Sequence, residues 1–197
     1  MVFFRKLELA FAVDRNIRTY GGTGVLQRRQ LADLVLPTGE LVLGYPGTPL
    51  INVPSKVHPR VAPGRYSSFI SFAHHPTGRN SFAYLSIRLS GASVSRWTSV
   101  GSFFTDSGTG CVVDRCLTES VRQQGKDLPW EKWYELKTSV FNEGDGSLRL
   151  DELTGANAII FATLDGSWDC FVGYGRSGCP AWLVIDGRCP RWWEVWR

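Results

Sequence analysis

Short apolar segments separated by turn-forming residues run through this sequence, and they constrain the fold more than any other feature. Residues 65–75 (RYSSFISFAHH) and 81–91 (SFAYLSIRLSG) are rich in aromatic, β-branched and small polar residues, and PTGRN lies between them. Segments of this kind joined by a turn containing Gly and Pro are typical of antiparallel strands with one buried face. The pattern predicts a β-hairpin over this part of the chain.

The same alternation of apolar runs and turns predicts strands elsewhere. Residues 31–46 (LADLVLPTGELVLGYP) predict a hairpin or a strand–turn–strand, because Pro fixes φ and Gly adopts conformations that other residues avoid. The three glycines of RTYGGTG (18–24) indicate a loop. The Pro-rich stretch from 46 to 63 indicates a surface crossing or a sheet edge, since Pro has no N–H for a central strand. Further strands are predicted at 1–14, 94–100, 158–164, 169–175 and 181–187.

A helical pattern interrupts the strands between residues 117 and 141. Thr118 is a suitable N-cap for LTESVRQQ, and Pro129 stands where a first helical turn tolerates proline. Apolar residues then recur at helical spacing at Trp130, Trp133, Leu136 and Val140, as expected of a face packed on a sheet. We therefore predict a single mainly β domain over 1–197, an antiparallel β-sandwich or open barrel with a helical insertion near 117–141. An α+β fold is the alternative.

Charge and hydropathy exclude several classes of protein. The net charge of +4 is mild, and Arg28–Arg29 is the densest basic run, which is unlike the clustered Lys and Arg of nucleic-acid-binding proteins. No apolar run reaches the length of a membrane span. Arg5, Lys6 and Glu8 interrupt the apolar start, which is atypical of a secretory signal. We expect a cytoplasmic protein that binds neither nucleic acid nor membrane, and the sequence leaves its oligomeric state open.

Metal and cofactor motifs are weak. The five cysteines have no C-x2-C spacing, and we expect them to be reduced. His74 and His75 are adjacent, so in a strand they point to opposite faces and would not share a metal. Residues 142–153 (NEGDGSLRLDEL) imitate a calcium loop with Gly146 at the sharp turn, but Phe141 then stands at the first ligand position. We predict no cofactor and no metal, and whether 143–152 binds calcium stays open.

Two glycine-rich turns carry the candidate site residues. In TDSGTGCVVD (105–114), Asp106 and Asp114 bracket a flexible core that contains Thr109. Glycines let backbone N–H groups converge on a ligand, although an Asp in this position can equally cap its own turn. In GYGRSGCP (173–180), Arg176 lies at the tip, where it would bind an anion with two hydrogen bonds or remain solvated. Whether the two turns form one site is open.

At these turns the chain resembles a bacterial family of uncharacterised function, the DUF4241 family, from about residue 35 to 187. The resemblance rests on five segments in the family's order: Leu36-Pro37-Thr38-Gly39, Pro63-Gly64-Arg65-Tyr66-Ser67, Arg96-Trp97, Thr105 to Asp114, and Gly173 to Pro180. It implies that the glycine turns are a family signature, but it implies no activity. The family's Gly-Asp-Gly is Gly175-Arg176-Ser177 here, so an acid has been replaced by a cation.

Three functions are compatible with these residues. The first is a binding or regulatory module, of an immunity or signalling type, that holds a protein or a small anionic ligand with aromatic and Arg side chains. The second is a small hydrolase or lyase with Asp106 and Asp114, and Arg65 or Arg176, in one cleft. The third is a structural protein stabilised by a metal at 143–152. We favour the first, and whether the chain is an enzyme is left uncertain.

Overall fold

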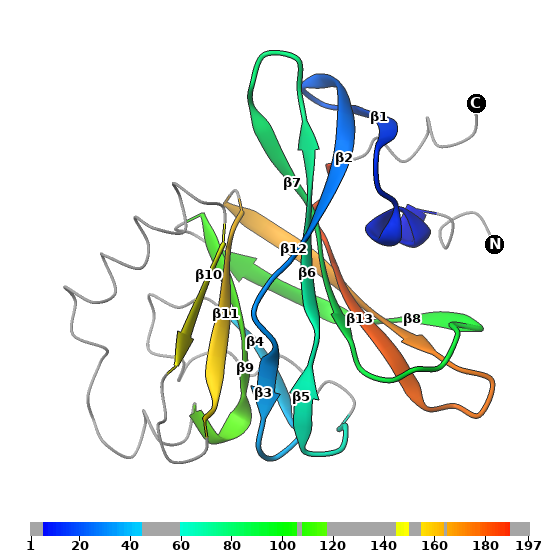
Figure 1. Ribbon diagram of the computed structural model, residues 1–197, viewed down its shortest axis with the longest axis vertical. Helices are drawn as coiled ribbons and strands as arrows, with labels where there is room; N and C mark the ends of the chain where they lie inside the picture. The colour runs from blue at the N-terminus through cyan, green and yellow to red at the C-terminus, as the bar shows by residue number, and fades with distance from the viewer. Residues whose placement is uncertain are drawn as a thin grey trace. The chain divides into compact units, whose positions relative to one another are not determined.

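The computed structural model describes residues 6–44, 60–105, 108–117, 145–149, 155–163 and 165–189, with the backbone alone at 145–149. The chain forms two compact units that alternate along the sequence (Figure 1). The first unit comprises residues 1–30, 68–99 and 168–197, and the second comprises residues 31–67 and 100–167. This division does not test the prediction of a single domain, which stays a prediction. Each unit is described by itself.

The fold is mainly β, with antiparallel sheets, as the sequence predicts. The largest sheet has seven strands in the order β1-β2-β6-β7-β13-β12-β8. Its two ends are the edge strands β1 and β8, so the described strands form an open sheet and not a closed barrel. The strands are β1 (Arg15–Thr19), β2 (Gly22–Gln30), β6 (Ser68–His74), β7 (Asn80–Arg88), β8 (Arg96–Thr105), β12 (Gly166–Tyr174) and β13 (Pro180–Asp186).

Two hairpins of the same construction lie side by side in this sheet, because β7 pairs with β13. In the β6–β7 turn, the N–H of His75 donates to the carbonyl of Arg79 (2.9 Å). The equivalent bond in the β12–β13 turn runs from Gly175 to Cys179 (2.9 Å). Each turn then needs a positive φ three residues after its start, and Gly78 (80°) and Gly178 (82°) supply it. The predicted strand pairs at 65–91 and 169–187 are therefore confirmed.

The second unit is built on two smaller sheets. A four-stranded sheet has the order β10-β11-β9-β4, and a separate pair joins β3 to β5. Phe161 of β11 and Val112 of β9 are completely buried, and Phe103 packs edge-on to Phe161 with ring centroids 6.3 Å apart. The strands are β3 (Leu34–Leu36), β4 (Leu41–Gly44), β5 (Gly64–Tyr66), β9 (Thr109–Asp114), β10 (Asp145–Arg149) and β11 (Asn157–Ala162).

Residues 31–44 form the strand–turn–strand that is predicted for 31–46, and not a hairpin; residues 45 and 46 lie outside the described ranges. β3 and β4 flank the Pro-Thr-Gly turn, yet β3 pairs with β5 and β4 pairs with β9. The turn therefore passes the chain from one sheet to another. Of the helical insertion predicted at 117–141, only residue 117 is described, at the end of a helical turn over 115–117; residues 118–144 lie outside the described ranges.

Two local predictions are wrong. Residues 6–8 are helical and continue into the 3-10 turn η1 (Leu9–Phe11), where a strand over 1–14 is expected. Leu7 and Leu9 are buried in the core of the first unit, so the apolar residues reflect packing and not strand alternation. The expected loop at 18–24 is a tight hairpin, since β1 and β2 pair up to Thr19 and Gly22 and leave two residues between them.

A buried ion pair joins the helical start of the first unit to β13. The Nζ of Lys6 lies 2.7 Å from Oδ2 of Asp186, and both side chains are buried. The Tyr84 hydroxyl donates to the carbonyl of Lys6 (3.0 Å). Burial, reinforced by the charge of Asp186, raises the pKa of Tyr84 well above its ordinary value. The ion pair and this hydrogen bond thus attach residue 6 to the sheet.

Candidate functional site

Asp114, a candidate ligand residue, lies at the end of β9 with its carboxylate buried against the Pro-Thr-Gly turn. Its Oδ2 accepts hydrogen bonds from the backbone N–H groups of Thr38 (2.9 Å) and Gly39 (3.2 Å). Its Oδ1 accepts from the Thr38 hydroxyl (2.7 Å) and from the N–H of Cys116 (2.8 Å). Four protein donors therefore surround a side chain that is 0% exposed, and the carboxylate holds the turn in place.

The turn that Asp114 holds is tightly packed. Gly39 has φ 73°, and a Cβ at this position would lie 1.9 Å from the carbonyl oxygen of Val61. The N–H of Val61 donates to the carbonyl of Gly39 (2.9 Å), so the approach is a direct backbone contact. Only glycine satisfies both requirements, which explains the Gly of the Leu36-Pro37-Thr38-Gly39 segment in physical terms.

Thr109 lies at the start of β9 and is buried. The turn before it is held by a neighbouring segment: Gly108 donates its N–H to Oδ1 of Asp165 (2.8 Å), and Thr163 donates its N–H to the carbonyl of Gly108 (2.7 Å). Asp165 is an acid at this turn that sequence reasoning missed. Asp106, the residue expected to cap the turn or face a ligand, lies outside the described residues.

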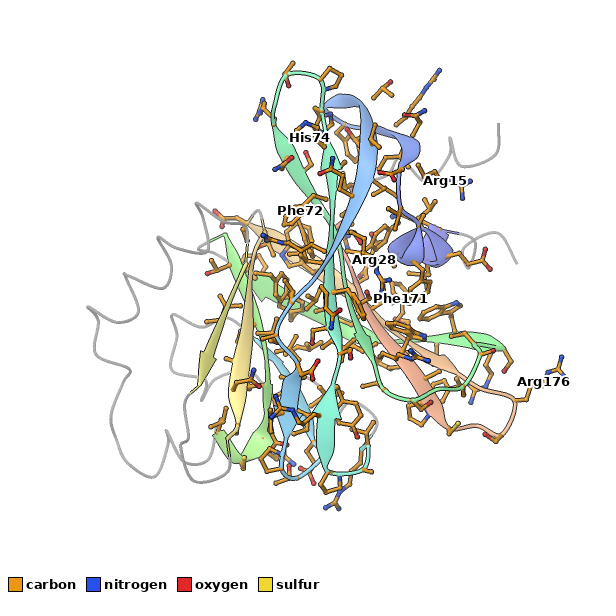
Figure 2. The ribbon with its side chains drawn as sticks, viewed as in Figure 1. Arg15, Arg28, Phe72, His74, Phe171 and Arg176 are labelled. Atoms are coloured by element: carbon orange, nitrogen blue, oxygen red, sulfur yellow. The ribbon has the colours of Figure 1, made fainter. Side chains whose placement is uncertain are left out.

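Arg65 and Arg176 are both exposed, but on different elements. Arg65 lies on β5, with its Nε 3.9 Å from Oδ2 of Asp33, a surface pair that contributes little to stability. Arg176 is at the tip of the β12–β13 hairpin, where Figure 2 shows its side chain projecting outward. Arg65, Thr109 and Asp114 belong to the second unit and Arg176 to the first. Within the second unit, Arg65 and Asp114 have different partners.

The segments that carry the family resemblance make contacts within each unit. In the second unit, Asp114 binds the Leu36–Gly39 segment, and β5 of the Pro63–Ser67 segment pairs with β3. In the first unit, the Arg96 guanidinium lies 4.3 Å from the ring centroid of Tyr174. A Cβ on Gly173 would lie 3.1 Å from the Trp97 ring. These contacts are structural, and none brings reactive groups together.

Arg28 is the cationic residue best placed to bind an anion, and the sequence analysis did not select it as a site residue. Arg28 lies on β2, and its guanidinium carbon is 3.8 Å from the ring centroid of Phe69, 5.8 Å from Phe11 and 5.7 Å from Trp182. We call these four side chains the Arg28 cluster (Figure 2 labels Arg28). The Nε and Nη2 atoms are buried and have no hydrogen-bond partner among the described residues. Burial lowers the pKa of Arg28 from its ordinary value.

Strand register explains why these side chains meet. Arg28 is opposite Ser71 of β6, and Phe69, two residues earlier on β6, projects to the same face. Phe69 is opposite Ser86 of β7, whose buried hydroxyl also has no partner among the described residues. A period of two from the buried Leu26 to Arg28 is the sequence signal that places Arg28 on the core-facing side of β2.

Three of the cysteines are buried thiols whose surroundings disfavour nucleophilic activation. All five lie in the described ranges and form no disulfide with one another. Burial raises the pKa of both Cys111 and Cys189 to about 12, and it raises the pKa of Cys170 further. A reactive cysteine needs a lowered pKa. Cys179 is exposed in the β12–β13 turn, 3.1 Å from the Ser177 hydroxyl.

The residues that could bind metal are placed as follows. His74 Nδ1 lies 2.8 Å from Oδ1 of Asn80 and His75 Nε2 lies 3.0 Å from the Ser81 hydroxyl; His74 is partly exposed and His75 is buried. Gly146, the expected sharp-turn residue of a calcium loop, pairs with Ile160 in the regular β10–β11 ladder. In the part of the chain that is described, no group of three His, Cys, Asp or Glu residues is placed to hold a metal ion.

Comparisons with known proteins give no relative from which a function could be transferred. No family model, no curated protein and no solved structure matches the chain. The resemblance to the DUF4241 family therefore stays a prediction. Within the described ranges, no helix combines the length and apolarity that crossing a membrane requires.

Proposed function

We propose that this protein is a binding or regulatory module, of an immunity or signalling type, that holds a protein or a small ligand through an anionic group. The Arg28 cluster is the observation that supports this function. A guanidinium that stays charged near neutral pH lies among three aromatic rings with two of its nitrogens unpartnered in the described part of the chain. A buried donor without an acceptor costs free energy, and an incoming anion would recover it.

The alternative function, a small hydrolase or lyase, has less support. It needs two carboxylates in different environments near the glycine turns. The Asp114 carboxylate already accepts four hydrogen bonds from the protein, so it is poorly placed to serve as a base or a nucleophile. The large pKa shifts in the described residues are those of buried Cys and Tyr side chains, and they disfavour ionisation instead of promoting reaction.

Thermal melting against a ligand panel tests the binding function. The panel contains nucleotides, sugar phosphates, amino acids and simple carboxylates, and a ligand that binds the native state raises the melting temperature. We expect at least one anion to stabilise the wild type and to lose this effect in Arg28→Gln. The matched control is Arg96→Gln, because Arg96 also lies over a ring, that of Tyr174, but donates a hydrogen bond to Thr98 (2.9 Å). Equal shifts in wild type and Arg28→Gln would contradict the role of the cluster.

A further inference from the structure

We propose, on the basis of the binding function above, that Arg28 anchors a carboxylate site. In this site the Nε–H and Nη2–H groups donate two parallel hydrogen bonds to the carboxylate of a small aromatic acid. The inference rests on which nitrogens lack a partner, on the charge of the cluster and on the rings around it.

The identity of the two unpartnered nitrogens sets the geometry. The atoms without a partner among the described residues are Nε and Nη2, which share one edge of the planar guanidinium. Their N–H bonds are parallel, and their spacing matches the two oxygens of a carboxylate. One carboxylate would therefore satisfy both donors with two nearly linear hydrogen bonds, whereas a halide or a single carbonyl oxygen would have to be shared between them with bent geometry.

The charge of the cluster favours a monoanion. Phe11, Phe69 and Trp182 are neutral, so Arg28 contributes the one formal charge of the Arg28 cluster. A carboxylate neutralises this charge. A phosphate dianion would leave an uncompensated negative charge among aromatic rings, which is costly where water is excluded.

The rings favour a flat apolar body on the acid. Phe69 covers one face of the guanidinium at 3.8 Å, and Phe11 is tilted against Trp182 with centroids 4.7 Å apart. All three rings are only partly buried, but Phe69 already covers the guanidinium, so Phe11 and Trp182 are the side chains that must rotate to admit a ligand and can then pack on its ring. The buried Ser86 hydroxyl, on the residue opposite Phe69, is a further donor on this face.

Calorimetric titration of the full chain with benzoate tests the site. Benzoate is expected to bind the wild type and Arg96→Gln alike, and to bind at least 10-fold more weakly to Arg28→Gln and Arg28→Lys. Lys keeps the charge but lacks the parallel N–H pair, so retention of affinity within twofold in Arg28→Lys would overturn the two-bond geometry. Circular dichroism checks that the variants fold.

A neutral ligand gives a control that needs no variant. Benzamide has nearly the shape of benzoate without its charge, and it is expected not to bind the wild type. Equal binding of benzamide and benzoate would overturn the carboxylate site and leave only an apolar pocket. The peptide Ala-Ala-Phe presents the same carboxylate next to an aromatic residue. If the peptide binds in an Arg28-dependent way and benzoate does not bind, the proposal of a small aromatic acid is overturned. The carboxylate that the site recognises would then be the C-terminus of a polypeptide.

The two proposals can fail separately. If inorganic phosphate binds in an Arg28-dependent way while benzoate and the peptide do not, the carboxylate site is wrong and the anion-binding function stands. If no anion in either experiment binds, both are wrong.

Discussion

At the scale of single residues, Asp114 stabilises a turn. The N–H and hydroxyl donors around its carboxylate are of the same kind that a ligand site would use to bind an anion. Its two oxygens collect donors from Thr38, Gly39 and Cys116. Thr38 lies 76 positions away in the sequence, so local patterns could not identify the partner. The sequence did identify Asp114 as an acid beside a glycine-rich turn and it identified the Pro-Thr-Gly turn, but not that one stabilises the other.

Replacement of Asp114 by Asn tests this role. Asn has one acceptor oxygen, and its amide nitrogen would face buried donors, so at least one donor loses its partner. We expect the free energy of unfolding to fall by about 2–4 kcal/mol. Urea denaturation followed by circular dichroism measures the change.

The matched control is Asp165→Asn, because Asp165 is exposed and, among the described residues, accepts a single N–H, that of Gly108. It should cost less than about 1 kcal/mol. Equal losses of unfolding free energy in the two variants would show that burial of the carboxylate does not account for the stabilisation by Asp114.

At the scale of elements, the strands are better predicted than their pairing. The patterns at 65–91 and 169–187 identify both hairpins because the two strands and their turn are contiguous. β3 and β4 are also found, but their partners β5 and β9 come from distant segments. The helical start was missed because Leu7 and Leu9 are apolar for packing reasons that a short window cannot separate from strand alternation.

Gly178 in the β12–β13 turn allows the effect of backbone strain on stability to be measured apart from the effect of a steric clash. Gly178 has φ 82°, and a Cβ there would meet nothing within 4 Å. Gly178→Ala should therefore destabilise the protein by about 1–2 kcal/mol through strain alone, and Gly178→Asn should cost less because Asn tolerates this conformation. Urea denaturation measures both.

The control for strain is Gly91→Ala. Gly91 is equally open but has no positive φ, so the change should stay within about 0.5 kcal/mol of wild type. A loss at Gly91 as large as that at Gly178 would contradict an origin in φ.

At the scale of the whole molecule, buried thiols and a buried phenol make the free energy of unfolding fall as pH rises in the alkaline range. The folded protein raises the pKa of Cys111 and Cys189 from 9.0 to about 12, and it raises the pKa of Cys170 and Tyr84 as well. A raised pKa in the folded state contributes stability that is complete below the unfolded value and is lost as pH rises toward the folded value. The loss therefore begins near pH 9 and continues to about pH 12.

Chemical denaturation in a reducing buffer at several pH values measures this loss. Each buried thiol should contribute up to about 1.4 kcal/mol per pH unit in that window. Cys111→Ala should make the profile less steep by the share of one thiol, whereas Cys179→Ala, a change at an exposed residue, should leave it unchanged. A profile that stays level between pH 9 and 12 would contradict the burial of these groups.

The candidate site is less well predicted than the fold. Strand patterns report local alternation, and most of the sheet follows from them. The Arg28 cluster needs side chains from η1, β2, β6 and β13, and only the three pairings among β2, β6, β7 and β13 reveal that its strand residues share a face. Asp106, one of the candidate residues from the sequence, lies outside the described residues and keeps its candidate role as a prediction.

The alternation of the two units along the chain limits how such a protein can be divided or acquired. The first unit uses three stretches of sequence and the second uses two, so the chain passes between them four times, at residues 30–31, 67–68, 99–100 and 167–168. Neither unit corresponds to a continuous stretch of gene. A single cut in the polypeptide cannot release one of them whole, and a recombination event at one point cannot transplant one into another protein. The two units must therefore be inherited, expressed and folded as parts of one chain.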